Sequence, residues 1–101
     1  MKQIHKEAIF QNADAKRFEW NIEGKTAFID YILNPQNEIF LTHTEVPQEL
    51  EGKGIGSKLV RAVLDYIKEE DWTLYPTCPF VASYIKKHEE YQPLVKKGLR
   101  Y

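Results

Sequence analysis

Residues 52–58 read Gly-Lys-Gly-Ile-Gly-Ser-Lys, and this stretch separates two halves of the chain that differ in sequence period. Before it, apolar and polar residues alternate, which is typical of half-buried β-strands. After it, apolar residues recur at helical spacing. The sequence therefore predicts an α+β fold, in which an antiparallel meander is followed by helix, strand and helix around a mixed central sheet.

Three strands are expected before the glycine stretch. Phe18, Trp20 and Ile22 alternate with polar residues, and residues 26–33 and 38–46 are rich in β-branched and aromatic side chains. Residues 23–25 (Glu-Gly-Lys) and 34–37 (Asn-Pro-Gln-Asn) are turn sequences. An earlier strand is expected from about residue 4 to residue 10.

Strict alternation along residues 38–46 predicts the two faces of the third strand. One face is expected to carry Ile39, Leu41, His43 and Glu45. The opposite face is expected to carry Phe40, Thr42, Thr44 and Val46.

The second half predicts a helix, a short strand and a second helix. The first helix has an apolar stripe formed by Leu59, Val60, Val63, Leu64 and Ile67. Residues 72–75 indicate a short buried strand, which a right-handed crossover would place parallel to the third strand. Pro79 suits the first turn of the second helix, so Cys78 is expected at its N-cap. The predicted apolar stripe of that helix is Phe80, Val81, Tyr84, Ile85 and His88.

Composition narrows the function classes. The 101 residues suit one domain covering positions 1–101, and the 43% hydrophobic and 29% charged content is that of a globular protein. A net charge of −1 gives no reason to expect nucleic acid or an anionic membrane as a partner. With one cysteine, no apolar stretch long enough to span a bilayer and no apolar segment typical of a signal peptide, we expect a cytoplasmic protein.

The alternating glycines indicate an anion site. Glycine lets an anion approach the backbone, and the N–H groups and dipole at the start of the following helix stabilise phosphate oxygens. Lys53 and Lys58 add positive charge. The alternative is a tight strand-to-helix turn, for which one glycine would suffice. The spacing fits neither a Walker A loop nor a dinucleotide-binding fingerprint.

Two segments carry a resemblance to a known family. Residues 41–60, from Leu41 through the glycine stretch to Val60, resemble the acetyl-CoA-binding motif of the GNAT N-acetyltransferase superfamily, and residues 75–91 resemble its very small single-domain branch. The resemblance implies that the pyrophosphate of coenzyme A lies on the amides of residues 52–57. It also implies that pantetheine runs beside Thr44 to Val46 as an added pseudo-strand, in the gap before Leu74. The implied cofactor-binding residues are Thr44, Val46, Gly52, Lys53, Gly54, Ile55, Gly56, Ser57 and Lys58.

Two departures from the family pattern concern charge and length. Glu49 stands where the family has Gln or Arg, and Glu51 is a second acidic residue beside an anionic ligand. The short connection at residues 23–26 leaves no room for the helices that help to form the acceptor site in larger relatives. We therefore expect an acceptor side that is open or completed by a partner protein.

Four side chains are candidates for catalysis. Tyr84 corresponds to the general-acid tyrosine that the resemblance implies, and His43 and Glu45 are candidate bases acting through water. Cys78 at a helix N-cap is a candidate nucleophile or a wall of the acyl pocket. Each has a structural alternative: Tyr84 and Cys78 as core residues, His43 and Glu45 as a solvated strand face. The histidines are not spaced with Cys78 as a metal site, and no metal is predicted.

These residues predict acetyl transfer from acetyl-CoA to an amine acceptor, either a small molecule or a protein. Two alternatives remain open: a CoA-binding regulatory or partner module without transfer activity, and an interaction domain whose glycine turn is purely structural.

Overall fold

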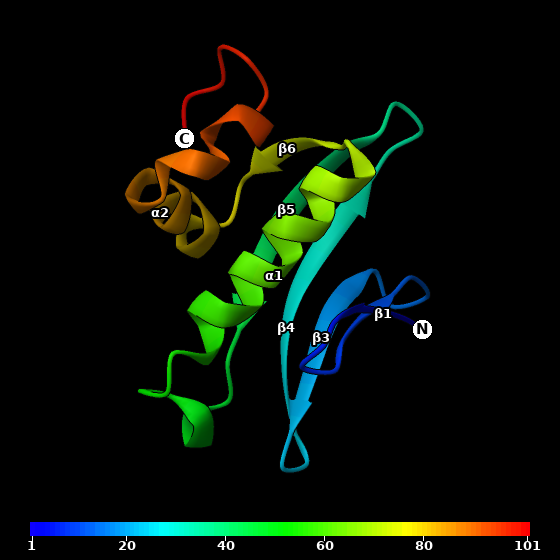
Figure 1. The fold of residues 1–101 in the computed structure, drawn as a ribbon, viewed down its shortest axis with the longest axis vertical. Coiled ribbons are helices and arrows are strands. Elements are labelled where there is room, and N and C mark those ends of the chain that lie inside the picture. Colours follow the sequence, from blue (N-terminus) through cyan, green and yellow to red (C-terminus); the bar gives the residue numbers. More distant parts are fainter.

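The computed structural model describes all residues from 1 to 101 and contains one six-stranded sheet with the strands in sequence order, β1-β2-β3-β4-β5-β6 (Figure 1). The strands are β1 (Lys2–His5), β2 (Ile9–Asn12), β3 (Arg17–Ile22), β4 (Lys25–Leu33), β5 (Glu38–Glu45) and β6 (Thr73–Pro76). The helices are α1 (Ile55–Glu70) and α2 (Pro79–Lys87), with 3-10 turns η1 (Gln48–Leu50) and η2 (Glu89–Leu94).

The predicted meander of β3, β4 and β5 is confirmed. All three strands pair antiparallel, and the β3–β4 hairpin closes through Glu23 and Gly24, whose φ angles of 51° and 79° are both positive. Two left-handed residues match the twist of a tight hairpin. β3 and β4 pair without a register shift from Arg17↔Asp30 to Ile22↔Lys25.

The prediction of one strand from residue 4 to residue 10 is wrong, because this segment is a hairpin of two short strands. β1 and β2 pair antiparallel around residues 6–8, and Ala8 adopts a φ of 61°. The amide of Ala8 donates to the carbonyl of His5 at 3.2 Å, which closes the turn. Local pattern alone did not indicate this turn, because it contains neither glycine nor proline.

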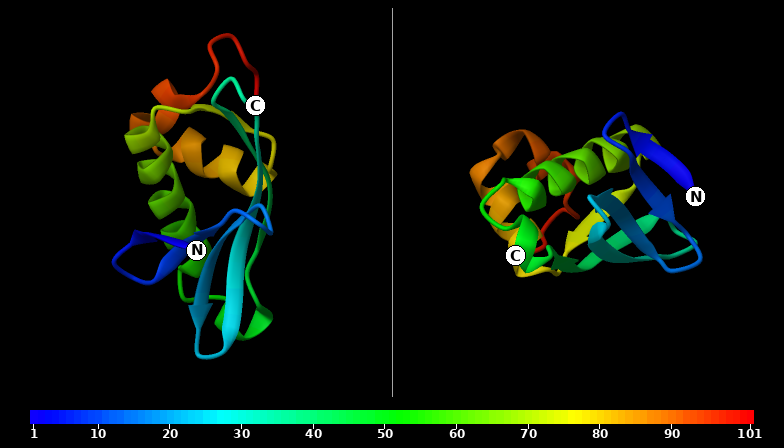
Figure 2. Two further views of the ribbon diagram at one scale, coloured as in Figure 1. Left: turned by 90° about the vertical axis from the view of Figure 1, so that its right-hand side faces the viewer. Right: turned by 90° about the horizontal axis from the view of Figure 1, so that it is seen from below.

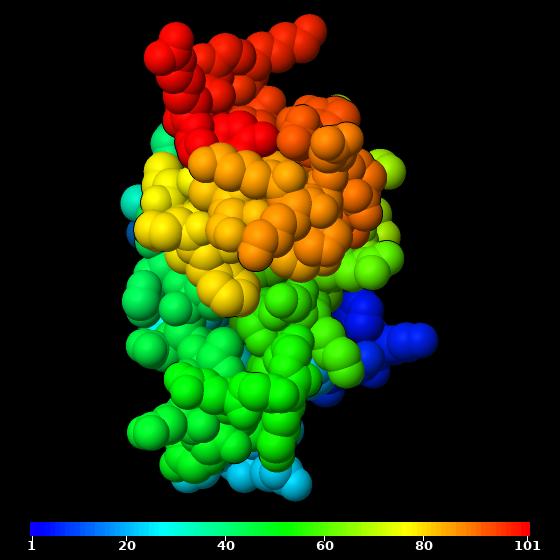
Figure 3. All heavy atoms as spheres, turned by 90° about the vertical axis from the view of Figure 1, so that its left-hand side faces the viewer, coloured from blue at the N-terminus to red at the C-terminus, as the bar shows by residue number.

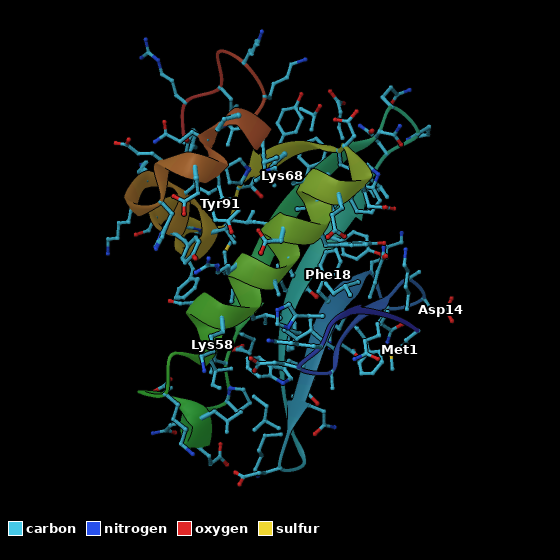
Figure 4. All side chains as sticks on the ribbon, in the orientation of Figure 1. Met1, Asp14, Phe18, Lys58, Lys68 and Tyr91 are labelled. Carbon is cyan, nitrogen blue, oxygen red and sulfur yellow. The ribbon has the colours of Figure 1, made fainter.

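Both helices cover one face of the sheet, the inner face, as the two views in Figure 2 show. The predicted stripe of α1 is confirmed, since all five of its apolar residues have no exposed surface. α1 connects β5 to β6, which pair parallel, so the sheet is mixed as predicted. The side chain of Phe18 extends from β3 toward α1 and belongs to a core of 24 buried residues (Figure 4). Neither helix is both long enough and apolar enough to cross a bilayer.

A β-bulge changes the predicted faces of β5. Tyr31 pairs with Leu41, but the preceding residue Asp30 pairs with His43, so Thr42 is an extra residue in β5. An extra residue reverses the alternation beyond it. The prediction that His43 and Glu45 share a face with Ile39 and Leu41 is therefore wrong. His43 and Glu45 lie on the outer face, and the side chain of Thr44 is on the helix-covered face opposite Ile29.

The second helix begins as predicted, with Cys78 at the N-cap and Pro79 in the first turn. Its stripe is only partly as predicted. Val81, Tyr84 and Ile85 are buried, whereas Phe80 is 44% exposed and lies outside the core. His88 ends the helix as a half-buried C-cap residue.

Candidate functional site

A gap opens between β5 and β6 where their pairing stops. The parallel register ends at Leu41↔Pro76, and the amide of Cys78 then donates to the carbonyl of Leu41 at 2.8 Å. β5 continues to Glu45 with no strand on that side. The gap therefore lies beyond Pro76, and the expectation of a gap before Leu74 is corrected: Thr73 is already bonded to the carbonyl of Asn37.

The gap leads into a cleft of about 440 Å³ at the start of α1. In Figure 3 the beginning of α2 meets the loop and first turn of α1 on this side of the molecule. The cleft is lined by the end of β5, η1, the glycine stretch and the first turn of α2: Thr44, Glu45, Val46, Leu50, Glu51, Gly52, Gly54, Ile55, Gly56, Ser57 and Phe80.

Seven of the nine residues predicted to bind the cofactor line this cleft. Lys53 and Lys58 do not, and both side chains are exposed. Figure 4 shows Lys58 near the start of α1 and Lys68 near its other end. The structure thus brings seven of the predicted residues together around one cleft. The side chains of Lys53 and Lys58 lie on the surface outside it.

Two of the three glycines adopt left-handed backbone, and the third lies close to the ring of Phe80. Gly52 and Gly54 have φ angles of 81° and 72°, in the left-handed region that favours glycine. Gly56 has ordinary helical backbone, but a Cβ there would lie 2.9 Å from Cζ of Phe80. The expectation that one glycine would suffice for the turn is therefore wrong, since Gly52 and Gly54 both adopt left-handed backbone in it. A Cβ at position 56 would require only the exposed ring of Phe80 to shift.

The glycine stretch presents a row of free backbone donors. None of the six N–H groups from Gly52 to Ser57 makes an intramolecular hydrogen bond, and Gly54, the N-cap residue of α1, offers no side-chain cap. The positive end of the 16-residue helix α1 lies at the same place. This arrangement stabilises anionic oxygens, as helix N-termini approached by glycine do in phosphate sites.

The two acidic departures differ in position. Glu49 forms an ion pair with Lys25 at 3.3 Å and does not line the cleft. Its pKa is lowered, first by a backbone hydrogen bond within Glu49 and then by Lys25. Glu51 does line the cleft and is exposed. Of these two residues, only Glu51 therefore places a carboxylate in the cleft that the free amides border.

His43 and Glu45 lie together at the mouth of the cleft. The ring Nε2 of His43 is 3.5 Å from Oε1 of Glu45, and both side chains are more than half exposed. Because of the bulge, this pair lies on the outer face of the sheet, and Glu45 also contributes to the lining of the cleft.

Cys78 lies on the opposite, inner side of the same gap. Its thiol is 4% exposed and lies 3.4 Å from the hydroxyl of Thr44, which lines the cleft. The side chain makes no N-cap hydrogen bond to α2. Cys78 is thus buried behind Thr44, which separates it from the cleft.

Tyr84 lies in the middle of α2 and is not part of the cleft lining. Its ring is 8% exposed and stacks on His88, with the centroids 3.9 Å apart. Burial is the main cause that raises the pKa of Tyr84. Its hydroxyl has no hydrogen-bond partner, and no atom of Tyr84 lines the cleft.

Three lining residues were not among the predicted site residues: Leu50, Glu51 and Phe80. Leu50 is 2% exposed and closes the cleft from η1, while Phe80 leans over Gly56 from α2. Helical spacing predicted that Phe80 belongs to the core. Nothing in the neighbouring sequence distinguishes it from the buried residues of the same helix. The contact at Gly56 becomes visible only once α1 and α2 are packed.

Comparison with known proteins agrees with this architecture. Residues 17–94 match the GCN5-related N-acetyl-transferase family. A GCN5-like protein from Staphylococcus aureus, solved by NMR, superposes with a TM-score of 0.69 at 29% identity, covering all of this chain and 95% of that one.

Vertebrate relatives extend the match. Protein NATD1 of Danio rerio is 36% identical over 84 residues, which is 77% of this chain and 76% of the relative. Protein NATD1 of Gallus gallus is 42% identical over 48 residues, and this segment covers 48% of this chain and only 44% of the relative. The match thus spans less than half the length of the chicken protein. The family match over most of the chain and the shared fold lead to one conclusion: this protein belongs to the GCN5-related N-acetyltransferase family.

Proposed function

We propose that the protein binds acetyl-CoA in the cleft and transfers its acetyl group to a primary amine. The observation that carries the proposal is the row of six unpaired N–H groups from Gly52 to Ser57, at the positive end of α1 and at the edge of a cleft. Family membership supplies the reaction class.

The residues of the cleft fit coenzyme A in two respects. The free amides of residues 52–57 would hold the pyrophosphate. The edge of β5 from Thr44 to Glu45 has no strand partner beyond the gap, so its peptide groups would pair with the amides of pantetheine. Exposed Lys53 and Lys58 would add positive charge beside the phosphates, and Glu51 opposes it.

When bound, acetyl-CoA would supply the acetyl group as a thioester. Glu45 accepts the amine proton through a water molecule, and His43, 3.5 Å away, helps to hold the carboxylate in place. Thr44 and Cys78 form the inner wall of the gap, where the acyl group would lie.

One observation favours a second function, CoA binding without transfer. Tyr84, the predicted general acid, is not among the residues that line the cleft. A protein with this arrangement could bind coenzyme A as a regulatory or partner module. Release of free thiol from acetyl-CoA in the presence of an amine distinguishes the two functions.

The test of binding compares two glycine variants. Gly54→Val and Gly24→Val both place a side chain at a positive φ with nothing within 4 Å, but only Gly54 lines the cleft. Both are expected to lower stability by about 1–2 kcal/mol or more. With acetyl-CoA at about 100 times its dissociation constant, the wild type and Gly24→Val should melt about 10–20 °C higher, and Gly54→Val should not.

Three results would contradict parts of the proposal. Unchanged melting of the wild type at millimolar acetyl-CoA, with unmoved amide resonances of residues 52–57, would exclude the cleft as a CoA site. Normal binding by a folded Gly54→Val variant would show that the glycine stretch serves only the turn. If acetyl-CoA binds but no amine from a panel releases thiol, the non-catalytic module is the correct function.

A further inference from the structure

The outer face of the sheet carries no covering helix, and it leads directly to the cleft. In Figure 2 both helices lie on one side of the sheet and no helix lies on the other. Cross-strand pairing places two rows of side chains on this outer face. One row is Phe10, Glu19, Phe28 and Glu45, and the other is Asn12, Arg17, Asp30 and His43. Both rows end at the residues of the cleft mouth.

The outer face is acidic although the chain as a whole is nearly neutral. It carries four carboxylates, Glu19, Asp30, Glu38 and Glu45, against the guanidinium of Arg17 and the ammonium of Lys96 beside Glu38. That guanidinium is already engaged, because its Nε lies 3.3 Å from Asp30 and its centre lies 3.8 Å from the ring of Phe28. These six groups give the face a net charge of −2, against −1 for the entire protein.

Aromatic and aliphatic surface lies among these charges. Phe40 stacks on Tyr75 with the centroids 4.4 Å apart, and its cross-strand neighbour Ile32 is 55% exposed. Aromatic faces attract ammonium and guanidinium groups. Acidic and aromatic side chains together form a surface suited to lysine and arginine side chains.

The shape of the face favours a macromolecule over a small molecule. Glu19, Phe28, Asp30 and Phe40 line none of the five principal clefts. Small ligands require concave sites that bury most of their surface, whereas protein segments bind flat surfaces of several hundred Å². A second copy of this chain is a poor occupant, because two such faces would bring eight carboxylates together.

We propose that this outer face binds a basic, lysine-bearing segment of a partner protein and presents one of its amines to the cleft beside His43 and Glu45. The proposal rests on the proposed function, since the cleft supplies the acetyl group. It identifies the acceptor as a polypeptide, which the flat, acidic face recognises through the residues that flank the reactive lysine.

The experiment uses three amines with the full chain and acetyl-CoA. They are a 12-residue peptide with one lysine flanked by arginines, the same peptide with glutamines in place of the arginines, and n-butylamine. The double variant Glu19→Lys/Ile32→Lys raises the net charge of the outer face by three and replaces no residue that lines the cleft. The control Glu69→Lys/Gln92→Lys makes the same charge change at exposed positions of α1 and η2.

The expected result is a difference in kcat/KM confined to the basic peptide. It should be the best of the three acceptors, and the outer-face variant should lower its kcat/KM about tenfold, in a salt-dependent manner. Glu19→Lys turns an attractive charge into a repulsive one, and Ile32→Lys adds a second repulsive charge. The control variant should stay within about twofold, and n-butylamine should be unaffected by either. Adding the peptide should shift the amide resonances of Glu19, Phe28 and Phe40.

Three other results are informative. Equal kcat/KM for both peptides, with unmoved outer-face resonances, overturns the proposal while leaving acetyl transfer intact. Spermidine that reproduces the peptide's shifts and its sensitivity to Glu19→Lys/Ile32→Lys would identify a small polyamine and also overturn it. If no amine releases thiol but the peptide still shifts the outer face, and the variant abolishes those shifts, the docking surface stands and catalysis fails.

Discussion

At the residue scale, Gly54 tests how backbone conformation governs stability. Its φ is 72°, and a Cβ there would meet no atom within 4 Å, so the only penalty for alanine is the left-handed backbone. We expect Gly54→Ala to lower the free energy of unfolding by about 1–2 kcal/mol. Gly54→Asn should lose less, because asparagine tolerates this region. Urea unfolding of both variants measures the difference, and equal losses would contradict the explanation.

Tyr91 is the residue whose protonation most clearly couples to folding. Its hydroxyl donates to Oδ1 of Asp65 at 2.6 Å, and burial first, then this bond, raises the pKa of Tyr91 to about 12. The unfolded chain releases this proton near pH 10, so the folded state is favoured below pH 10 and the advantage is lost as the pH rises toward 12.

The Tyr91→Phe variant should therefore be about 1–3 kcal/mol less stable than the wild type at neutral pH. This difference should be constant from about pH 7 to 9 and shrink between about pH 10 and 12. Urea unfolding at a series of pH values measures it. Tyr101→Phe is the control, because the Tyr101 hydroxyl makes no hydrogen bond to another side chain. A difference that persisted unchanged to pH 12 would contradict the pKa shift.

At the scale of elements, the start of α2 predicts the behaviour of Cys78. The thiol is 4% exposed and does not cap the helix, so Cys78→Ala should lose no cap, whereas Cys78→Ser supplies a capping oxygen. We expect slower labelling by iodoacetamide than for a free thiol, because the reagent needs access as well as thiolate. Rapid labelling that acetyl-CoA prevents, with loss of transfer in Cys78→Ser, would instead support the nucleophile.

The elements also show what the sequence could predict. The stripe from Leu59 to Ile67 and the alternation in β3 are strong periodic signals, and both were correctly interpreted. The bulge at Thr42 was missed, because residues 42–45 are polar on both faces and give no periodic signal. In the structure, the buried residues Ile29 and Tyr31 of β4 lie opposite Thr44 and Leu41, on either side of the bulge. Phe80 was misplaced because helical spacing cannot distinguish the core from a cleft wall.

At the scale of the whole molecule, the sheet should not open uniformly. β1 and β2 have four residues each, lie at one edge, and have only Ile9 fully buried. Their amides should exchange with solvent at least about 100-fold faster than those of β4, which lies between two strands beneath α1. Hydrogen exchange followed by NMR measures this, and uniform protection across the sheet would contradict it.

The candidate site is also a property of the whole molecule. The glycine stretch identified one wall of the cleft from local sequence, but the other walls come from β5, η1 and α2. The position of Tyr84 depends on the angle at which α2 packs, which no local pattern specifies. The backbone part of the site was therefore predictable, and the placement of catalytic side chains was not.

The extra residue at Thr42 decides which face of the sheet every later side chain of β5 occupies. Removing it would exchange the two sides of β5 from His43 onward, moving Thr44 away from Cys78 and His43 toward the helices. A length difference of one residue at this point therefore exchanges two surfaces of the molecule, whereas the same difference in the Asn34–Asn37 turn would only lengthen or shorten a loop. A relative that lacks a residue at position 42 should therefore have different side chains at the cleft and at the outer face, even where the rest of β5 is the same.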